Sequence, residues 1–599
     1  MTSFASLPQE IIDIIADKLT KTDLTQAVRV NKEWTTSFTP SLWRELYIVD
    51  RTINDCFHTP ESRSAFIRNS LYIRTVETTD PELAVFFAFR HPSITHLSSL
   101  ILRLTGQPTR SIIDIVPSTA EMDTVQGIDV DGNAFAILEL LKKNRNLRSL
   151  SLHEWCFWNK DGKEDLFLPI IAAISPTYLE KLEVSCFPLD EDTFDNNNND
   201  FDDEEFEEQM KGLRKATAAF RDKESFSALK ELSILGSHFG RTDLTWLAFL
   251  KLCPEVERIC LGALDEILFL LLPTLLQLAC PKLRRLDWTN CGMDSDEYIA
   301  KLLQASKLGW RELHLPRMIF FGGEAFAALV QSAETLEVLQ IMGAGQRQEL
   351  EQNAVLELLC SARNLRRLEG VADGQRDILL VMELSVHAQN AYLERIDGSS
   401  EGRSWVMGPS VEYFQLQIEG VPRPDVMYRQ SGLELTIQQT GLDFSLRYIV
   451  QQWIYTQLGR MTNLQELILG LTDYNPEVYS YYQFDEVVLS NLVLLEEMML
   501  RNGIPTFHYL SLELSLASGL SLLAGLKELR VLDVRMTAHN IRVEELEWMH
   551  WNWPKLEKVR GLESDRGWSM DRDDGPAIRA DVEAWMAAHP RGIGCSFYL

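Results

Sequence analysis

The chain has 599 residues, of which 45% are hydrophobic, and its formal net charge at pH 7 is -29. This length and composition indicate a folded protein built of several globular domains or of one long repeat array. The strong negative charge argues against a chain-wide surface for nucleic acid or for an anionic membrane, so we expect neither as a partner.

The nine cysteines are scattered along the chain and form no Cys-x-x-Cys pair. An odd, scattered set is typical of reduced thiols in the cytosol or nucleus, and this spacing predicts no zinc site. Asp13 and Asp17 lie where a secretory signal would be apolar, and the longest apolar run, residues 267–280, is too short to span a bilayer. We therefore expect a cytoplasmic or nuclear protein that needs no metal or other cofactor.

Residues 1–46 have the pattern of three short helices. Ser6 is followed three residues later by a glutamine, which is the spacing of a capping box for the first helix. We expect Asp23 to lie at the start of the second helix, Asn31 to cap the third helix and Pro40 to end it.

The apolar residues of this segment exceed what three short helices can bury among themselves. A unit of about 40 residues buries too little surface to be stable alone. The excess must therefore pack against the next domain or against another protein. A terminal cap of a repeat array is an alternative that packing alone leaves open.

The order of residues in this segment resembles the F-box. The family's Leu-Pro-x-Glu opening, its Asp-Leu pair and its closing Pro-x-Leu-Trp correspond to residues 7–10, 23–24 and 40–43. F-box proteins are the target-binding subunits of SCF-type cullin-RING ubiquitin ligases, and their F-box binds a Skp-type adaptor that binds the cullin. The resemblance implies that seven residues lie at or just behind the adaptor surface: Leu7, Pro8, Ile11, Ile15, Leu19, Val30 and Trp34.

We expect residues 47–96 to form a helical junction, because they show no clean strand pattern. From residue 97 to residue 564 one phrase recurs: an apolar residue, two others, an apolar residue, one other and an apolar residue. The copies begin at Leu97, Val125, Leu147, Leu179, Leu229, Val256, Leu283, Trp310, Leu336, Leu365, Leu393, Val411, Leu464, Leu495, Leu529 and Leu556. The middle copies follow one another every 26 to 29 residues, and such a period indicates a solenoid.

Amphipathic stretches lie between the copies, for example residues 134–143 and 324–333, so each unit is predicted to be a strand, a turn and a helix. This pattern resembles the helix-bearing form of the leucine-rich repeat. The resemblance implies an α/β fold: a curved solenoid with parallel strands on its concave face and helices on its convex face. Each unit then buries its apolar positions against its neighbours.

Two segments depart from the repeat. Residues 190–208 contain eleven acidic residues and no basic residue, which predicts a disordered loop inserted in the array. The loop has three interpretations: a solvated insertion without a role, a docking motif for a basic partner around its phenylalanines, or a calcium site. The last lacks the glycine and the spacing of an EF-hand loop. We expect residues 565–599 to form a C-terminal cap that contains one amphipathic helix, residues 577–588.

The polar residues between the apolar positions should line the concave face, and arginines recur among them. Five of these residues are our candidates for binding a target protein: Arg258, Arg285, His314, Arg367 and Arg395. The same column includes Asp533, Arg535, Lys558 and Arg560. One interpretation is a ladder of weak surface ion pairs. The other is a recognition strip for an acidic peptide or a phosphorylated residue, because arginine pairs with such groups through two hydrogen bonds.

The chain has no phosphate-binding glycine loop, no His-Glu-x-x-His and no Gly-x-Ser-x-Gly, so we expect no catalytic residues. Our leading hypothesis is a target-recognition subunit of an SCF-type ubiquitin ligase. It would bind a Skp-type adaptor and, through it, a cullin, while the repeats bind an unknown target protein. A non-degradative interaction scaffold is the alternative. A third hypothesis, an inhibitor or GTPase-activating protein built on the same repeat, is disfavoured by the F-box resemblance.

Overall fold

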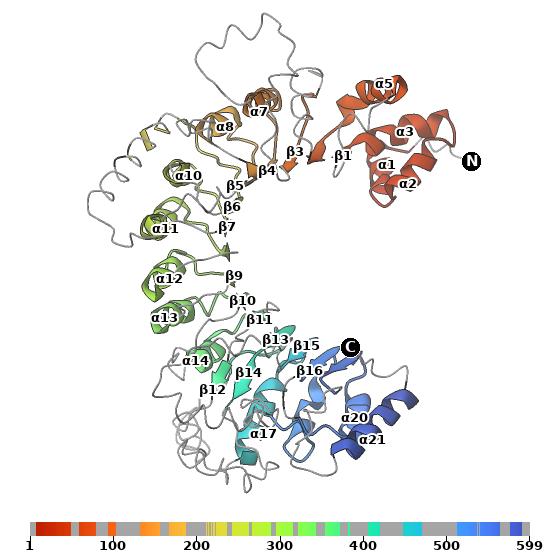
Figure 1. Cartoon of the computed structure of the whole chain (residues 1–599), viewed down its shortest axis with the longest axis vertical. Helices are drawn as coiled ribbons and strands as arrows, with labels where there is room; N and C mark the ends of the chain where they lie inside the picture. Colours follow the sequence, from red (N-terminus) through yellow and green to blue (C-terminus); the bar gives the residue numbers. More distant parts are fainter. Residues whose placement is uncertain are drawn as a thin grey trace, which may run out of the picture. The chain divides into compact units, whose positions relative to one another are not determined.

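The computed structural model describes residues 7–48, 59–79, 94–103, 132–155, 167–186, 211, 214, 217–218, 220–221, 223–235, 242–262, 266–288, 295–315, 322–342, 354–371, 381–383, 405–419, 447–469, 512–535, 537, 539–562 and 575–589. Its contacts divide the chain into two units, Met1–Leu283 with Ser306–Leu308, and Arg284–Ala305 with Gly309–Leu599. Figure 1 shows the described helices and strands coloured along the sequence.

The first unit begins with three helices: α1 (Gln9–Ala16), α2 (Lys21–Ala27) and α3 (Lys32–Trp43). A capping box starts α2, because the Thr20 hydroxyl accepts a hydrogen bond from the Asp23 amide and the Asp23 carboxylate accepts one from the Thr20 amide, both at 3.1 Å. The Asn31 side chain accepts a hydrogen bond from the Trp34 amide at 2.8 Å, which confirms the predicted cap of the third helix.

Pro40 does not end the third helix, so that expectation is wrong. Helix α3 continues through Pro40 to Trp43. Proline removes one helical hydrogen bond, but packing on both sides of it holds the helix together: Phe38 is buried, and the Trp43 ring lies against Phe66 with their centroids 6.3 Å apart. At the start of α1, Pro8 makes no side-chain capping hydrogen bond, and Ser6 lies outside the described residues.

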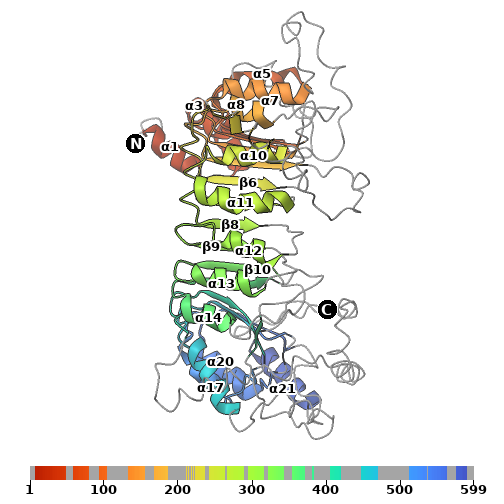
Figure 2. The ribbon, with the colours of Figure 1, turned by 90° about the vertical axis from the view of Figure 1, so that its left-hand side faces the viewer.

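Parallel strands follow the helices in the first unit. They are β1 (Glu45–Ile48), β2 (Thr75–Thr78), β3 (Ser99–Arg103), β4 (Ser149–Trp155), β5 (Lys181–Cys186), β6 (Glu231–Leu235) and β7 (Arg258–Leu261). The helices of this unit are α5 (Pro60–Asn69), α7 (Gly132–Lys143), α8 (Phe167–Ala173), α10 (Thr242–Leu250) and α11 (Glu266–Ala279), with a 3-10 turn at Ser70–Tyr72. Helices α8, α10 and α11 cover one face of the strands (Figures 1 and 2).

The sheet begins earlier than we expected. The predicted helical junction over residues 47–96 is wrong in part, because β1 and β2 lie at its start and within it, with α5 between them. A sequence signal for β1 exists: Trp43, Leu46 and Ile48 have the spacing of the repeat phrase. Trp43 also fits the closing Pro-x-Leu-Trp of the F-box resemblance, so the two patterns overlap at this residue.

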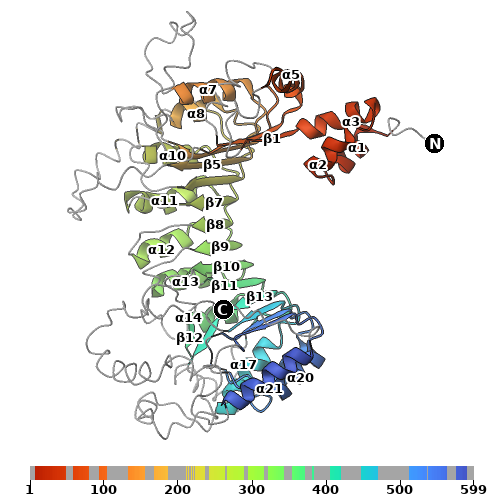
Figure 3. The same ribbon diagram turned by 45° about the vertical axis from the view of Figure 1, so that its right-hand side comes forward.

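The second unit continues the same pattern. Its strands are β8 (Arg285–Trp288), β9 (Glu312–Leu315), β10 (Val338–Met342), β11 (Arg367–Val371), β13 (Tyr413–Gln415), β15 (Glu466–Ile468), β16 (Val531–Asp533) and β17 (Lys558–Arg560); β12 (Val381–Glu383) and β14 (Gln417–Glu419) form a separate parallel pair. Its helices are α12 (Asp296–Leu303), α13 (Gly323–Gln331), α14 (Ala354–Ser361), α17 (Arg447–Leu458), α20 (Val543–Asn552) and α21 (Gly575–Ala588), with a 3-10 turn at Leu520–Gly525. Helices α12, α13 and α14 lie on one face of strands β8 to β11 (Figure 3).

The described residues thus form a fifteen-stranded sheet with helices, in which each pairing between strands of one unit is parallel. The predicted mixed α/β, solenoid-like class is confirmed. The curvature implied by the resemblance stays a prediction. The acidic segment 190–208 lies outside the described residues. The helix that we expected in the C-terminal segment is present as α21, with Val582 and Trp585 buried.

The core of the sheet comes from the middle apolar position of each phrase. In-register pairing places these residues side by side on successive strands, and all of them are fully buried: Leu150, Leu182, Leu232 and Ile259 in the first unit, and Leu286, Leu313, Leu339 and Leu368 in the second. Each such side chain contributes about 2 kcal/mol through burial. A single strand–turn–helix repeat therefore becomes stable only through packing against neighbouring repeats.

Three predicted copies, at residues 125–130, 393–398 and 495–500, lie outside the described residues. Among the described strands, β3 pairs with β4, β11 with β13, and β15 with β16.

Candidate functional site

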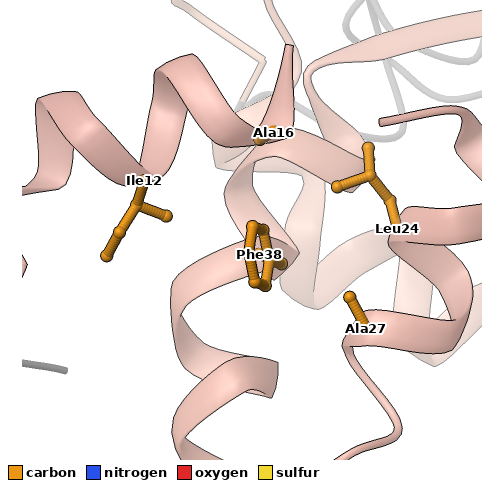
Figure 4. Close-up of a cluster of buried hydrophobic side chains, with 5 residues drawn as sticks. All are labelled: Ile12, Ala16, Leu24, Ala27 and Phe38. Carbon is orange, nitrogen blue, oxygen red and sulfur yellow. The ribbon is translucent and has the colours of Figure 1, made fainter. Parts of the chain in front are cut away.

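The three N-terminal helices have a small core of their own. Five side chains form it, and Figure 4 shows them converging from all three helices: Ile12, Ala16, Leu24, Ala27 and Phe38. Five more apolar residues pack against this core and stay partly exposed: Ile15, Leu19, Val28, Trp34 and Leu42. The Trp34 and Phe38 rings meet edge to face with centroids 5.6 Å apart. The unit therefore has a defined inside and outside.

Four of the seven residues predicted at the adaptor surface lie on the outside of these helices. Leu7, Ile11 and Val30 are 37%, 41% and 59% exposed, and Pro8 is also exposed. The other three, Ile15, Leu19 and Trp34, are half-buried against the core and support the unit from within.

Ile14, which we did not select, is 59% exposed. Ile11 and Ile14 are three residues apart, so they share one side of α1, and Leu7 lies two residues before the helix begins. We call these three residues the α1 apolar face. The buried stripe of α1 instead runs through Ile12 and Ala16.

The helices are fastened to the beginning of the sheet. The Arg44 guanidinium pairs with Asp13 at 3.5 Å and with Asp17 at 2.8 Å, which ties the end of α3 to α1. The Arg44 carbonyl accepts hydrogen bonds from the Arg74 and Thr75 amides at 2.8 and 3.0 Å, at the start of β2. The helical unit and the first strands therefore hold each other in place.

The predicted column of polar residues exists on the strands of the second unit, and its members pair with one another. Arg285 lies 3.4 Å from Glu312 of the adjacent strand, and His314 lies between Asp287, at 3.6 Å, and the side-chain oxygen of Gln340. These contacts bring the candidates Arg285 and His314 together on β8 and β9.

Arg367 takes part in a different set of contacts on β11. It pairs with Glu369 at 2.8 Å, and its guanidinium lies over the Tyr413 ring, 4.1 Å from the centroid. Burial, and then the charges of Glu369 and Glu466, raise the pKa of Tyr413, so its phenol stays neutral. Arg258 lies on β7, in register with Glu231 of β6, and Arg395 lies outside the described residues.

In the first unit the polar column brings a serine, a carboxylate and a histidine together. They are not arranged as a nucleophilic serine with its general base. The Ser151 hydroxyl donates to the Glu183 carboxylate at 3.2 Å. His153 and Lys181 lie 3.7 and 3.3 Å from the same carboxylate. A nucleophilic serine would donate to the imidazole, so these residues form an ion-pair cluster.

A second cluster surrounds Asp533 on β16. Its residues belong to the predicted polar column but are not among our five candidates for target binding. The Asp533 side chain is 0% exposed. Arg535 Nε donates to both Asp533 carboxylate oxygens, at 3.0 and 3.1 Å, and Arg535 Nη2 donates to Oδ2 at 2.8 Å. The Arg535 amide adds a bond of 3.1 Å, and Arg560 Nη1 on β17 lies 3.4 Å away. Among the described residues of the polar column, Asp533 is the most buried carboxylate.

Within the described part of the chain, no group of three or more His, Cys, Asp or Glu side chains is placed to hold a metal ion. None of the helices described is long and apolar enough to cross a membrane. Cys253 and Cys280 are free thiols, and both are buried. Burial raises the pKa of Cys280 to about 12, which keeps this thiol protonated at neutral pH.

No family model matches the chain, and a search of curated proteins finds no significant match. Neither comparison assigns the chain to a family. Three features remain that bear on function: the α1 apolar face, the polar column, and the resemblance of the N-terminal segment to the F-box.

Proposed function

We propose that this protein is a non-catalytic target-recognition subunit of an SCF-type ubiquitin ligase. Helices α1 to α3 bind a Skp-type adaptor, which connects the chain to a cullin, and the polar column of the sheet binds the target protein. The observation that carries the proposal is the α1 apolar face, because Leu7, Ile11 and Ile14 are 37%, 41% and 59% exposed on a unit that already has its own core.

An adaptor would cover the surface that these side chains leave in water. Complete burial of a Leu or Ile side chain contributes about 1.5–3 kcal/mol. Since roughly half of each side chain is already covered, the three residues together would add about 3 kcal/mol to binding. Large aliphatic side chains gathered on one helix face are typical of a protein–protein contact.

The polar column supports the target-binding half of the proposal. Its side chains alternate in sign and are partly exposed, as in the pairs Arg285–Glu312 and Arg367–Glu369. Exposed pairs of this kind contribute little to stability. They offer charged groups that a complementary partner can meet with good specificity.

A pull-down of the intact chain tests the proposal. The test variant is Ile11→Asp/Ile14→Asp, which charges the α1 apolar face without touching the core. The matched control is Ile67→Asp, because Ile67 is 50% exposed on α5 of the same unit. The wild type and the control should bring down both adaptor and cullin, and the double variant should bring down neither.

Two other outcomes separate the alternatives. Adaptor without cullin would favour a non-degradative scaffold. Absence of both partners from the wild-type pull-down would contradict the proposal and leave the helices as a cap of the repeat array. Leu7, Pro8 and Val30 would be charged next, one at a time, to map the extent of the adaptor contact.

A further inference from the structure

The side chains around Asp533 carry more positive than negative charge. Arg535 lies two residues after Asp533, which is the last residue of β16, and its guanidinium contacts the Asp533 carboxylate. Arg560 is the in-register partner of Asp533 on β17 and contacts the same carboxylate. Lys558, two residues before Arg560, shares its face of β17. We call these four residues the Asp533 cluster. Two guanidinium groups contact the one carboxylate, in a chain whose net charge is -29.

Asp533 holds the two arginines with different strength. Arg535 makes a forked contact with both carboxylate oxygens, whereas Arg560 makes one long bond of 3.4 Å through Nη1. A buried carboxylate is costly without charged partners, and the Arg535 fork together with its amide supplies them. Asp533 therefore positions Arg560 without using its capacity to bind.

Arg560 has hydrogen-bond donors to spare. A guanidinium has five N–H groups, and the single bond to Asp533 is the contact of the Arg560 side chain with the described residues. The side chain is 32% exposed, and β17 is the last strand in the order of the described sheet. Among the described residues, none other than Asp533 has to be displaced for an incoming group to reach these donors.

The nearest strands add only one carboxylate to the surface. On β15, Glu466 is in register with Val531, and Ile468 is in register with Asp533. Among the described residues, no contact joins Glu466 to Arg560. The partly exposed Arg560 guanidinium therefore favours an anion, and its forked geometry suits a planar carboxylate or a phosphate.

We infer that the Asp533 cluster binds the anionic group, carboxylate or phosphate, of an acidic peptide segment in the target protein. This inference rests on the proposed function, because it names the chemistry that the target-binding face selects. It also moves the recognition site from the arginines that we chose in the sequence to β16 and β17. Arg367, by contrast, pairs with Glu369 at 2.8 Å and lies over the Tyr413 ring.

Fluorescence anisotropy with three labelled peptides of equal length tests the inference. One peptide is rich in glutamate, one carries phosphoserines, and one carries glutamine at the same positions. The wild-type chain should bind at least one anionic peptide about tenfold more tightly than the glutamine peptide, and this preference should weaken as salt is raised. The peptide that binds identifies the carboxylate or the phosphate as the ligand.

Two variants with the same change in net charge make the test specific. Arg560→Gln should lose about tenfold in affinity for the anionic peptide. Arg363→Gln should bind the peptide as the wild type does. Arg363 is 65% exposed, pairs with Glu334, and precedes β11, which β13, β15 and β16 separate from β17 in the sheet. Arg535 is left intact, since its removal would leave the buried carboxylate without its main partner.

Equal binding of all three peptides, or equal loss in the two variants, would overturn the inference. Circular dichroism spectra confirm that both variants are folded. The peptide assay does not involve α1 to α3. A failed adaptor pull-down and a failed peptide assay therefore refute different statements, one about the helices and one about the Asp533 cluster.

Discussion

Asp296 makes a contact between repeats whose strength can be worked out. Its carboxylate, at the start of α12, accepts hydrogen bonds from the amides of Gly322 at 2.6 Å, Glu324 at 2.8 Å and Ala325 at 3.1 Å. These amides lie at the start of α13, where a helix leaves its first N–H groups without internal partners. One repeat therefore caps the helix of the next.

The change Asp296→Ala should weaken this junction by about 2 kcal/mol. Loss of a helix cap costs about 0.5–2 kcal/mol, and the negative charge at the positive end of the helix adds about 0.3–1 kcal/mol. The upper part of the combined range applies, because Asp296 is half-buried and bonds to three amides. A loss of 2 kcal/mol corresponds to roughly 30-fold in the local opening equilibrium.

Amide hydrogen exchange measures this effect where it occurs, since a repeat array need not unfold in one step. Amides of α13 should exchange about 30-fold faster in Asp296→Ala, and amides of α7 should not change. The control is Glu297→Ala, which removes the neighbouring carboxylate and its exposed pair with Lys301. Similar exchange rates of α13 in the two variants would refute the capping argument.

Two further predictions follow from backbone geometry and from burial. Gly561→Ala should lower the midpoint of thermal unfolding by several degrees, because Gly561 has φ +101° and a Cβ atom would lie 2.6 Å from the Arg535 backbone nitrogen; Gly323→Ala, where nothing lies within 4 Å, should not lower it. The stability that Cys280 contributes should be present below pH 9 and decline as the pH rises toward 12, because the unfolded thiol loses its proton first. Urea midpoints of the wild type should therefore fall more steeply over this window than those of Cys280→Ala, and parallel slopes would contradict the assignment.

The parallel sheet could be predicted because its signal is local and repeated. Each copy brings its own three apolar positions, and register follows from stacking like positions, as with Leu286, Leu313 and Leu339. The first strand escaped notice because Trp43 belongs to two patterns at once.

The orientation of the N-terminal helices was less predictable. Helix α1 has apolar residues on several sides, so periodicity could not decide between Ile11 and Ile12 as the buried position. Only the packing of Ile12 against Phe38 decides it, and this depends on a residue of another helix. The role of Asp533 was equally beyond periodicity, since its burial depends on Arg535 and on a strand 27 residues further on.

A single residue, Arg44, separates the last N-terminal helix from the first strand. A flexible tether of many residues would let a docked partner wander through a volume that grows with tether length. Here the Arg44 carbonyl is bonded to the Arg74 and Thr75 amides, and its guanidinium is bonded to α1. A partner seated on the helices is thus carried in a set orientation to β1 and β2. The effective concentration of that partner at β1 and β2 is therefore determined by folded geometry and not by diffusion of a flexible chain.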